Sequence, residues 1–396
     1  MERKKLKAGI VGSGFAAAFH FEALKRVFGV DVEVAGVYSP TLAKREAFAR
    51  ERDLNPIGTL EELIEVSDVV HVCTPPATHE QITLKALEKG KSVIVEKPFT
   101  GYFGDGRKDF DGRSFPRKLG MERAMESVVR MIEAEKASKG KILYAENWVY
   151  APSIQKEREI IEKTGSQILW MHGEESHSGS HSPYYGMWSH SGGGSLMGKG
   201  VHPLTGALYL KKVEGRVRGN RPIRPRYVSC RTHSVTVSKN FKDLGHLRSD
   251  YRDIEDFAFT HVVFADDTFA DIFASELVLG GVHNWIEVNT NNHRAICNIN
   301  PNNSFMTYNP KDEYFRDIYV VEKTGTKQGW AFTSPDEDWF TGYQHEMEAF
   351  YRSVAQDEPP ESDSLLASDT IATVYASYLS AERKGSEVEV PLVEGV

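Results

Sequence analysis

The stretch Lys7–His20 constrains this chain more than any other, because it places a glycine-rich turn between a strand and a helix. It reads KAGIVGSGFAAAFH, in which the apolar residues 8–11 have strand character and the alanines after Gly14 have helical character. Gly12 permits a sharp turn, and Gly14 leaves the main chain bare where a pyrophosphate would approach. Ala17 permits close packing of helix on strand, and the helix N-terminus offers free N–H groups. A plain turn is the alternative, but the flanking elements favour a dinucleotide site.

The composition indicates a globular protein of two domains. The chain has 396 residues, of which 40% are hydrophobic and 26% charged. A chain of this length exceeds one ordinary core, so two domains are expected. No apolar run approaches the ~18 residues of a membrane span, and the basic N-terminus is not followed by a cleavage motif. We therefore expect a cytoplasmic protein with no membrane contact.

Charge and cysteine content argue against three further features. The formal net charge of −8 gives no general attraction to nucleic acid. The three cysteines, Cys73, Cys230 and Cys297, are far apart and form no CxxC motif. This pattern argues against a disulfide framework and against a zinc–thiolate site, so no metal is expected.

The first part of the chain alternates strands with helices, which predicts a parallel sheet. The expected strands cover residues 8–11, 33–38, 68–73, 92–95 and 141–147, and the expected helices cover 41–52, 59–66, 77–89 and 122–137. Residues 101–120 have no periodicity and predict an inserted loop, for which a lid or a subunit contact is favoured. We assign residues 1–147 to a Rossmann domain that includes this loop.

From Trp148 onward the pattern changes to that of an α+β domain, assigned to residues 148–396. In residues 255–264 large and small side chains alternate, which is typical of an antiparallel strand with one buried face. The other expected strands are 167–175, 227–235, 268–279 and 283–290, and the expected helices are 152–163, 203–212, 344–355 and 365–381. The fold class is therefore a parallel α/β domain followed by an α+β domain.

Four motifs together resemble the glucose–fructose oxidoreductase/inositol dehydrogenase (Gfo/Idh/MocA) family. They are G-x-G-x-x-A with His20, T-P-P-x-x-H from Thr74 to His79, E-K-P from Glu96 to Pro98, and G-G-G-x-L followed by G-x-H, ending at His202. The resemblance runs from residue 7 to about 210, and the C-terminal YASYLSAERKGSEVEVPL is also similar. It implies a large, mainly antiparallel open sheet in the second domain that forms dimers or larger homo-oligomers.

The resemblance also implies roles for individual residues. Lys97 takes the place of the family lysine that lies beside the nicotinamide and the substrate hydroxyl, and Glu96 and Pro98 help to orient it. The cofactor-binding set expected on this basis is Gly12, Ser13, Gly14, Phe15, Ala16, Ser39, Thr74, Pro75, Pro76, His79, Glu96, Lys97 and Asn147.

The second catalytic element of the family is D-x-x-x-H, and here the match is incomplete. The histidine is His202, but Gly198 stands at the aspartate position. A histidine base works best when another group fixes its tautomer and supports its positive charge. The group that orients His202 must therefore come from elsewhere in the chain, or Lys97 carries more of the work.

Ser39 follows the second expected strand, where an acidic residue usually binds the adenosine ribose of NAD. Nothing there would repel a 2′-phosphate, and Lys44 and Arg45 follow in the next helix. NAD is the expected cofactor, and NADP is not excluded.

The histidine-rich stretch after residue 170 has three interpretations. His177 and His181 have the spacing of a metal-binding pair on a helix, but glycines and a proline nearby argue against a helix. A plain surface loop is the second interpretation. Polar and aromatic side chains also suit a sugar, and we favour this substrate pocket, with Tyr150, His177, His181, Tyr184 and Trp188 as its residues.

The leading functional hypothesis is a nicotinamide-dependent dehydrogenase of a secondary hydroxyl of a sugar or glycoside. The segments EKPFTGYFG and HSGSH are most similar to a branch of the family that oxidises the 3-hydroxyl of glycosides, giving a 3-keto sugar. The alternatives are a redox-neutral, NAD-dependent glycosidase and a non-catalytic dinucleotide sensor. The retention of both Lys97 and His202 argues against the sensor.

Overall fold

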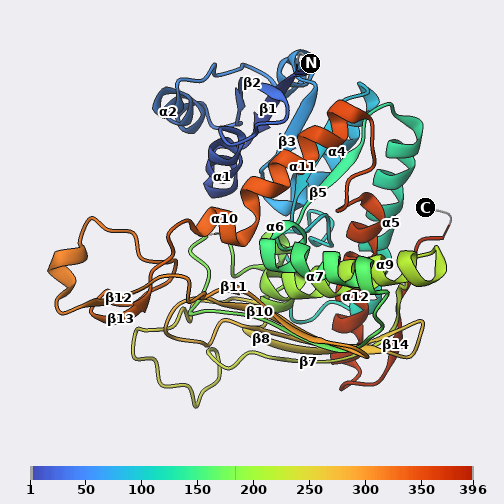
Figure 1. Cartoon of the computed structure of the whole chain (residues 1–396), viewed down its shortest axis with the longest axis vertical. Helices are drawn as coiled ribbons and strands as arrows, with labels where there is room; N and C mark the ends of the chain where they lie inside the picture. The colour runs from blue at the N-terminus through green and yellow to red at the C-terminus, as the bar shows by residue number, and fades with distance from the viewer. Residues whose placement is uncertain (1–2, 183, 395–396) are drawn as a thin grey trace.

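The computed structural model describes residues 3–182 and 184–394. Figure 1 shows two layers of structure, with the N-terminal strands and their helices above a second, larger sheet. None of the helices in the described part of the chain is long and apolar enough to cross a membrane. The predicted fold class, a parallel α/β domain followed by an α+β domain, is confirmed.

The first sheet has five parallel strands in the order β2-β1-β3-β4-β5. All four residues of β3 are buried, as expected for a central strand with both faces covered. The strands are β1 (Lys5–Val11), β2 (Asp31–Tyr38), β3 (Val69–Val72), β4 (Ser92–Glu96) and β5 (Ile142–Ala145). The helices are α1 (Phe15–Leu24), α2 (Leu42–Arg52), α3 (Leu60–Val66), η1 (Pro76–Thr78), α4 (His79–Glu88) and α5 (Arg117–Ala137).

The second sheet has seven strands in the order β11-β10-β6-β9-β8-β7-β14. It is mainly antiparallel, but β6 and β9 run parallel. The strands are β6 (Ile168–Ser176), β7 (Pro225–His233), β8 (Phe257–Phe264), β9 (Phe269–Ser275), β10 (His283–Thr290), β11 (Arg294–Asn300) and β14 (Val388–Glu389). In β8 buried and half-buried residues alternate, as its sequence predicted.

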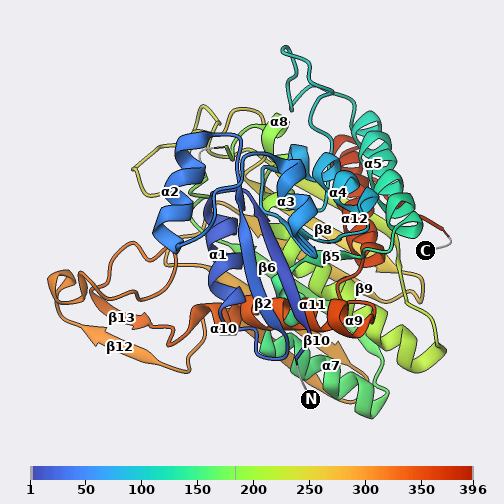
Figure 2. The same ribbon diagram turned by 90° about the horizontal axis from the view of Figure 1, so that it is seen from above.

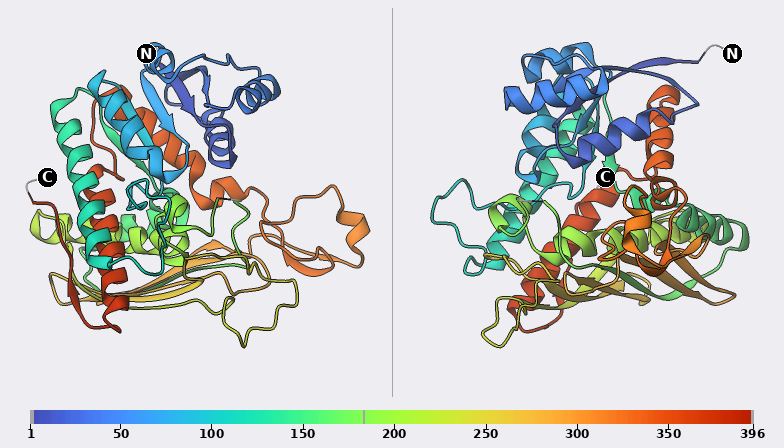
Figure 3. Two further views of the ribbon diagram at one scale, coloured as in Figure 1. Left: turned by 180° about the vertical axis from the view of Figure 1, so that it is seen from behind. Right: turned by 90° about the vertical axis from the view of Figure 1, so that its left-hand side faces the viewer.

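Helices cover one face of this sheet and leave the other face open, as Figures 1 and 3 show. The helices after β5 are α6 (Asn147–Tyr150), α7 (Pro152–Thr164), α8 (Trp188–Ser191), the π-helix η2 (Leu196–Gly200) and α9 (Val201–Gly219). An arm between β11 and the C-terminal helices contains β12 (Met306–Asn309), η3 (Asp312–Phe315) and β13 (Gly329–Phe332). Figure 2 shows this arm projecting from the body of the molecule.

The last helices return to the first sheet. They are α10 (Glu337–Thr341), α11 (Tyr343–Gln356) and α12 (Ser364–Glu382), of which α11 packs against α1 and α6, and α12 against α5 and α9. Beside them, Ser362 accepts a hydrogen bond from the Tyr144 N–H at 3.0 Å and donates to the Tyr144 carbonyl at 2.6 Å. The C-terminal segment therefore completes the edge of the first sheet. The boundary at residue 147 stays a prediction.

The inserted loop is shorter than predicted, because α5 begins at Arg117 rather than at residue 122. Phe110 and Phe115 pack on Tyr102, and Phe115 also contacts Trp188. The Arg117 guanidinium lies 4.3 Å from the Phe115 ring centroid and 4.2 Å from that of Trp188. The aromatic side chains of the loop are thus used within the chain, and a role as a lid stays a prediction.

Candidate active site

The turn after β1 has the geometry that its glycines predicted. Gly12 has φ +125°, and a Cβ there would lie 2.1 Å from the Cys73 carbonyl oxygen. A Cβ on Gly14 would meet no described atom within 4 Å, so its main chain faces open space. Helix α1 starts directly after Gly14 with no described side chain capping its N–H groups. A bare backbone and uncapped donors fit the diphosphate of a dinucleotide.

Ser39 lies close to this turn, and its hydroxyl accepts a hydrogen bond from the Ser13 hydroxyl at 3.1 Å. The Arg45 guanidinium donates to the Ser39 carbonyl at 3.3 Å and to the Gly58 carbonyl at 3.1 Å. Arg45 therefore reaches the end of β2, where the ribose of a dinucleotide would lie. Phe15, which belongs to the predicted cofactor-binding set, is 69% exposed at the start of α1.

The ends of β3 and β4 are tied together by His79. This buried side chain bonds through Nδ1 to the Pro98 carbonyl at 2.9 Å and through Nε2 to the Thr74 carbonyl at 2.9 Å. It joins the T-P-P turn to the E-K-P turn, so its role is to hold both turns at the carboxyl edge of the sheet. Ligands bind at this edge in open α/β sheets.

Lys97 extends from this edge to the second domain. Its Nζ donates to the Gly198 carbonyl at 3.0 Å. Gly198 lies in the π-helix η2, directly before α9. The structure thus brings Lys97 and the segment that carries His202 together across the domain boundary, as the resemblance implied.

His202 lies between two carboxylates, at the start of α9. Its Nδ1 is 2.5 Å from Oε1 of Glu146, and its Nε2 is 3.8 Å from Oε2 of Glu175. All three side chains are at most 10% exposed. Burial raises the pKa of Glu175, and the nearby side chains of His202 and Lys97 oppose this rise.

Glu146 therefore supplies the orienting carboxylate that the sequence lacks at Gly198. It follows β5 directly, at the same edge of the sheet as Glu96, and it caps α6 by accepting from the Trp148 N–H. Its position after a parallel strand is the signal that could have identified it. Glu175, at the end of β6, carried no such signal in the sequence.

Gly198 itself cannot hold a side chain without a rearrangement. A Cβ there would lie 2.6 Å from Cε2 and 2.7 Å from the hydroxyl of Tyr185. Tyr185 donates to Glu276 at 2.7 Å, and Tyr251 donates to the other oxygen of Glu276 at 3.0 Å. Lys199, the next residue along η2, forms a buried ion pair with the same carboxylate. Burial lowers the pKa of Lys199, and the Glu276 carboxylate opposes this effect.

This second buried cluster, which we name the Glu276 cluster, has no sequence signature, since only Lys199 falls within a motif, at a variable position of D-x-x-x-H. It consists of Tyr185, Lys199, Tyr251 and Glu276. The cluster holds η2 through Lys199, which is the residue after the one whose carbonyl Lys97 binds. The π-helical geometry, which occurs frequently at functional sites, lets Gly198 and Lys199 face different partners.

The histidine-rich stretch forms an irregular loop, so the helical metal-binding interpretation of His177 and His181 is wrong. The His177 Nδ1 accepts the Gly179 N–H at 3.0 Å. Burial holds the pKa of His177 well below its usual value, and the nearby Lys199 and Lys323 add to this effect. Among the described residues, no group of three or more His, Cys, Asp or Glu side chains could hold a metal ion.

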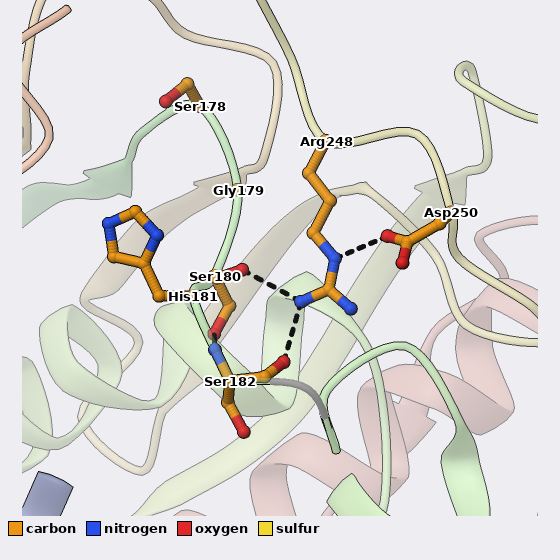
Figure 4. Close-up of a pocket in the computed structure, with 7 residues that line it drawn as sticks. All are labelled: Ser178, Gly179, Ser180, His181, Ser182, Arg248 and Asp250. Carbon is orange, nitrogen blue, oxygen red and sulfur yellow. Dashed lines mark hydrogen bonds and ion pairs between the residues drawn. The ribbon is translucent and has the colours of Figure 1, made fainter.

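A pocket of about 420 Å³ lies beside this loop (Figure 4). The Arg248 guanidinium donates to the carbonyls of Ser180 and Ser182 at 2.8 Å each and pairs with Asp250. On the other side, the Lys323 Nζ donates to the Gly179 carbonyl. The segment between β7 and β8, which carries Arg248, and the arm, which carries Lys323, therefore hold the loop in place. The pocket is lined by Ser178, Gly179, Ser180, His181, Ser182, Arg248 and Asp250.

Two residues of the predicted substrate-pocket set, Trp188 and Tyr150, lie away from this pocket. Trp188 is 1% exposed, and its Nε1 donates to the Tyr102 carbonyl. Tyr150 is 2% exposed, packs on Phe350 and accepts the Ser362 N–H. The structure thus assigns Trp188 and Tyr150 to packing, and their placement in the substrate pocket is not supported. Asn147 is bonded to the Thr341 carbonyl at 2.7 Å. The remaining pocket residue, Tyr184, is 49% exposed.

The fold and this site define a dinucleotide-binding oxidoreductase. Residues 6–108 match the family model described as "Oxidoreductase family, NAD-binding Rossmann fold" (GFO_IDH_MocA). This stretch of the nucleotide-binding domain is therefore similar to an NAD-binding oxidoreductase family, and the site fits NAD. The residues at Gly12–Gly14, Ser39 and the carboxyl edge of β3 and β4 are those that would hold it.

Relatives of known sequence are similar over part of their length. An uncharacterized oxidoreductase of Synechocystis sp. is 23% identical over 72% of this chain and 69% of its own. Inositol 2-dehydrogenase 1 of Paenarthrobacter aurescens is 31% identical over 35% of this chain and 41% of its own. Glucose-6-phosphate 3-dehydrogenase of Bacillus subtilis is 34% identical over 23% of this chain and 26% of its own.

Solved structures share the whole fold. GenD2 from gentamicin A biosynthesis, in complex with NAD, aligns with a TM-score of 0.77 at 21% identity, over 98% of this chain and 96% of its own. The myo-inositol 2-dehydrogenase of Lactobacillus plantarum aligns with a TM-score of 0.69 at 16% identity, over 98% of this chain and 100% of its own. The two-domain architecture is thus that of these structures.

We predict that Gly198→Asp destabilises the protein instead of providing an orienter for His202. The new side chain must displace the Tyr185 ring, and overpacking of this kind costs about 1–3 kcal/mol. Urea unfolding measures the change. The matched control is Gly219→Ala at the end of α9, where a Cβ meets no described atom within 4 Å and stability should hold or rise. A Gly198→Asp variant as stable as the parent would contradict the prediction.

Proposed function

We propose that this chain is an NAD-dependent dehydrogenase that oxidises a secondary hydroxyl of a sugar or glycoside, giving a 3-keto sugar from the 3-hydroxyl. The observation that carries the proposal is the arrangement of Lys97 and His202, with His202 held between Glu146 and Glu175 at the carboxyl edge of the sheet. The family match and the names of the relatives support the reaction class. One structural neighbour is a UDP-N-acetylglucosamine 3-dehydrogenase.

The geometry around His202 suits a proton acceptor. Glu146 accepts the Nδ1 hydrogen, which leaves the Nε2 lone pair free to take the hydroxyl proton of a substrate. The resulting imidazolium would lie between two carboxyl groups, which stabilise its charge. The Lys97 ammonium group has three N–H donors, of which one binds the Gly198 carbonyl, so the other two can bind the substrate oxygen. When NAD is bound, it accepts the hydride from the same carbon.

A redox-neutral glycosidase is the second candidate, and Glu175 favours it. Because burial raises the pKa of Glu175, this carboxyl group can stay protonated and serve as the acid that a leaving aglycone oxygen needs. A non-catalytic sensor would fit the missing aspartate at Gly198, but the carboxylate of Glu146 beside His202 argues against it. The proposed substrate region is the pocket lined by residues 178–182, which include His181.

We predict that glycosides, rather than nucleic acids or metals, are the ligands of this site. Mass spectrometry of the co-purified dinucleotide identifies the cofactor, and a glycoside screen then follows absorbance at the wavelength of reduced nicotinamide. Reduced cofactor together with a keto sugar supports the dehydrogenase. Free aglycone with an unoxidised sugar supports the glycosidase. Absence of both products across a broad panel of sugars and glycosides would refute the proposal.

We also predict that Glu146→Gln lowers kcat by about 10²- to 10⁴-fold, because His202 loses the carboxylate that orients it. Lys97→Ala should abolish turnover while NAD still binds. The matched control is Glu157→Gln, since Glu157 is a buried partner of His293 outside the site, at 2.8 Å. That variant should lose stability and keep its turnover. Equal losses of kcat in Glu146→Gln and Glu157→Gln would assign Glu146 a structural role only.

The open face of the second sheet supports a homo-oligomer. Aromatic side chains from neighbouring strands lie on it, with ring centroids 4.7 Å apart for Phe259 and Phe273 and 4.8 Å apart for His172 and Trp285. A half-exposed aromatic surface of this kind marks an interaction site. We predict a dimer or larger assembly in sedimentation equilibrium, which Phe269→Asp on the same face should dissociate. A parent protein that is monomeric at micromolar concentration would contradict this.

A further inference from the structure

A continuous chain of buried hydrogen bonds runs from Glu96 into the core of the first domain. The Glu96 Oε1 lies 2.9 Å from Nε2 of His20, whose Nδ1 lies 2.9 Å from Nδ1 of His71. The Nε2 of His71 lies 2.8 Å from the Tyr351 hydroxyl. His20, His71 and Tyr351 are all fully buried. The four residues come from β4, α1, β3 and α11, so the chain also joins the C-terminal segment to the first sheet.

Only one direction of donation satisfies every polar hydrogen in this chain. If Glu96 is ionised, it accepts from Nε2–H of His20, so the Nδ1 of neutral His20 accepts from Nδ1–H of His71. Nε2 of His71 then accepts the hydroxyl hydrogen of Tyr351. If Glu96 were protonated, all three bonds would reverse, and the Tyr351 hydroxyl hydrogen would have no acceptor among the described residues. An unpaired buried donor costs about 1–3 kcal/mol.

Electrostatics around Glu96 agree with this direction. Its second oxygen accepts the Lys97 N–H at 3.0 Å. Burial disfavours the charged form of Glu96, but the bond from His20 and the nearby charges of Lys97 and His79 lower its pKa overall. Burial holds the pKa of His71 well below its usual value, so His71 stays neutral.

The hydrogen bond from His20 holds Glu96 as a carboxylate at this edge of the sheet, where Glu146 also lies, paired with His202. The nearby Glu346 carboxyl group has its pKa raised well above the usual value by burial and by the carboxylates of Glu96 and Glu146, which favours its neutral form. The Lys97 ammonium group donates to the Gly198 carbonyl at 3.0 Å, and its charge lies close enough to Glu96 to favour the carboxylate form. The oxidised nicotinamide ring is cationic and the reduced ring is neutral, so a fixed negative charge nearby discriminates between them.

We propose that the Glu96–His20–His71–Tyr351 chain keeps a negative charge at the cofactor site and thereby favours oxidised over reduced NAD. His20 and His71 are positioning residues in this proposal, since they act through Glu96. The inference concerns cofactor binding alone, so it holds whichever substrate the enzyme takes.

The test compares the Kd of NAD⁺ with the Kd of NADH by calorimetric titration, with no turnover. Glu96→Gln and His20→Leu each remove the negative charge at position 96. Each should therefore raise the ratio of the Kd of NAD⁺ to the Kd of NADH by about tenfold. His20→Gln, which retains a donor for Glu96, should restore the ratio toward that of the parent. The matched control is His293→Leu, which breaks the Glu157 pair outside the site and should leave the ratio unchanged.

A purely structural role predicts a different outcome, in which both constants rise by the same factor in Glu96→Gln and His20→Leu. That result would overturn the proposal. Nitrogen-15 NMR of the histidines in the parent protein gives a second readout that needs no variant. We expect the hydrogen on Nε2 of His20 and on Nδ1 of His71. A hydrogen on Nε2 of His71 would show the reverse direction and would also overturn the proposal.

Discussion

The buried pair of Glu146 and His202 is the interaction on which the site depends. Both side chains are buried, and each supplies the hydrogen-bond partner that the other needs, because an unpaired buried polar group costs about 1–3 kcal/mol. Together they hold the end of β5 against the start of α9, and so fix the distance between the two domains. Lys97 and Gly198 then meet as a consequence of that closure.

The same closure explains why a glycine is acceptable at position 198. With the orienting carboxylate supplied by Glu146, the space that a side chain would need is occupied by Tyr185, which belongs to the Glu276 cluster. Glu146 thus takes over the orienting role of the missing aspartate, and the Glu276 cluster fills the space beside Gly198. Lys199 pairs with the buried Glu276 in this arrangement, a partner that Gly198 could not provide because it has no side chain.

Local rules were sufficient for much of the fold and for part of the site. Gly12 and Gly14 act through backbone geometry, and the alternation in β8 reflects a single buried face, so both could be predicted from short segments. Glu146 was missed because its partner is 56 residues away in the sequence. Trp188 was placed in the pocket because its neighbours are polar, yet the direction of its ring is set by packing with Phe115 from another segment.

The return of α11 to the first sheet has a consequence for synthesis on the ribosome. His71 lies at the centre of that sheet, but the hydroxyl that satisfies it belongs to Tyr351. The edge strand β5 likewise lacks its bonds to Ser362 until the last part of the chain has emerged. The nucleotide-binding domain is thus first in the sequence but cannot be the first to reach its final state. Its core stays incomplete for most of translation, so the chain must be protected from aggregation until its C-terminal helices arrive.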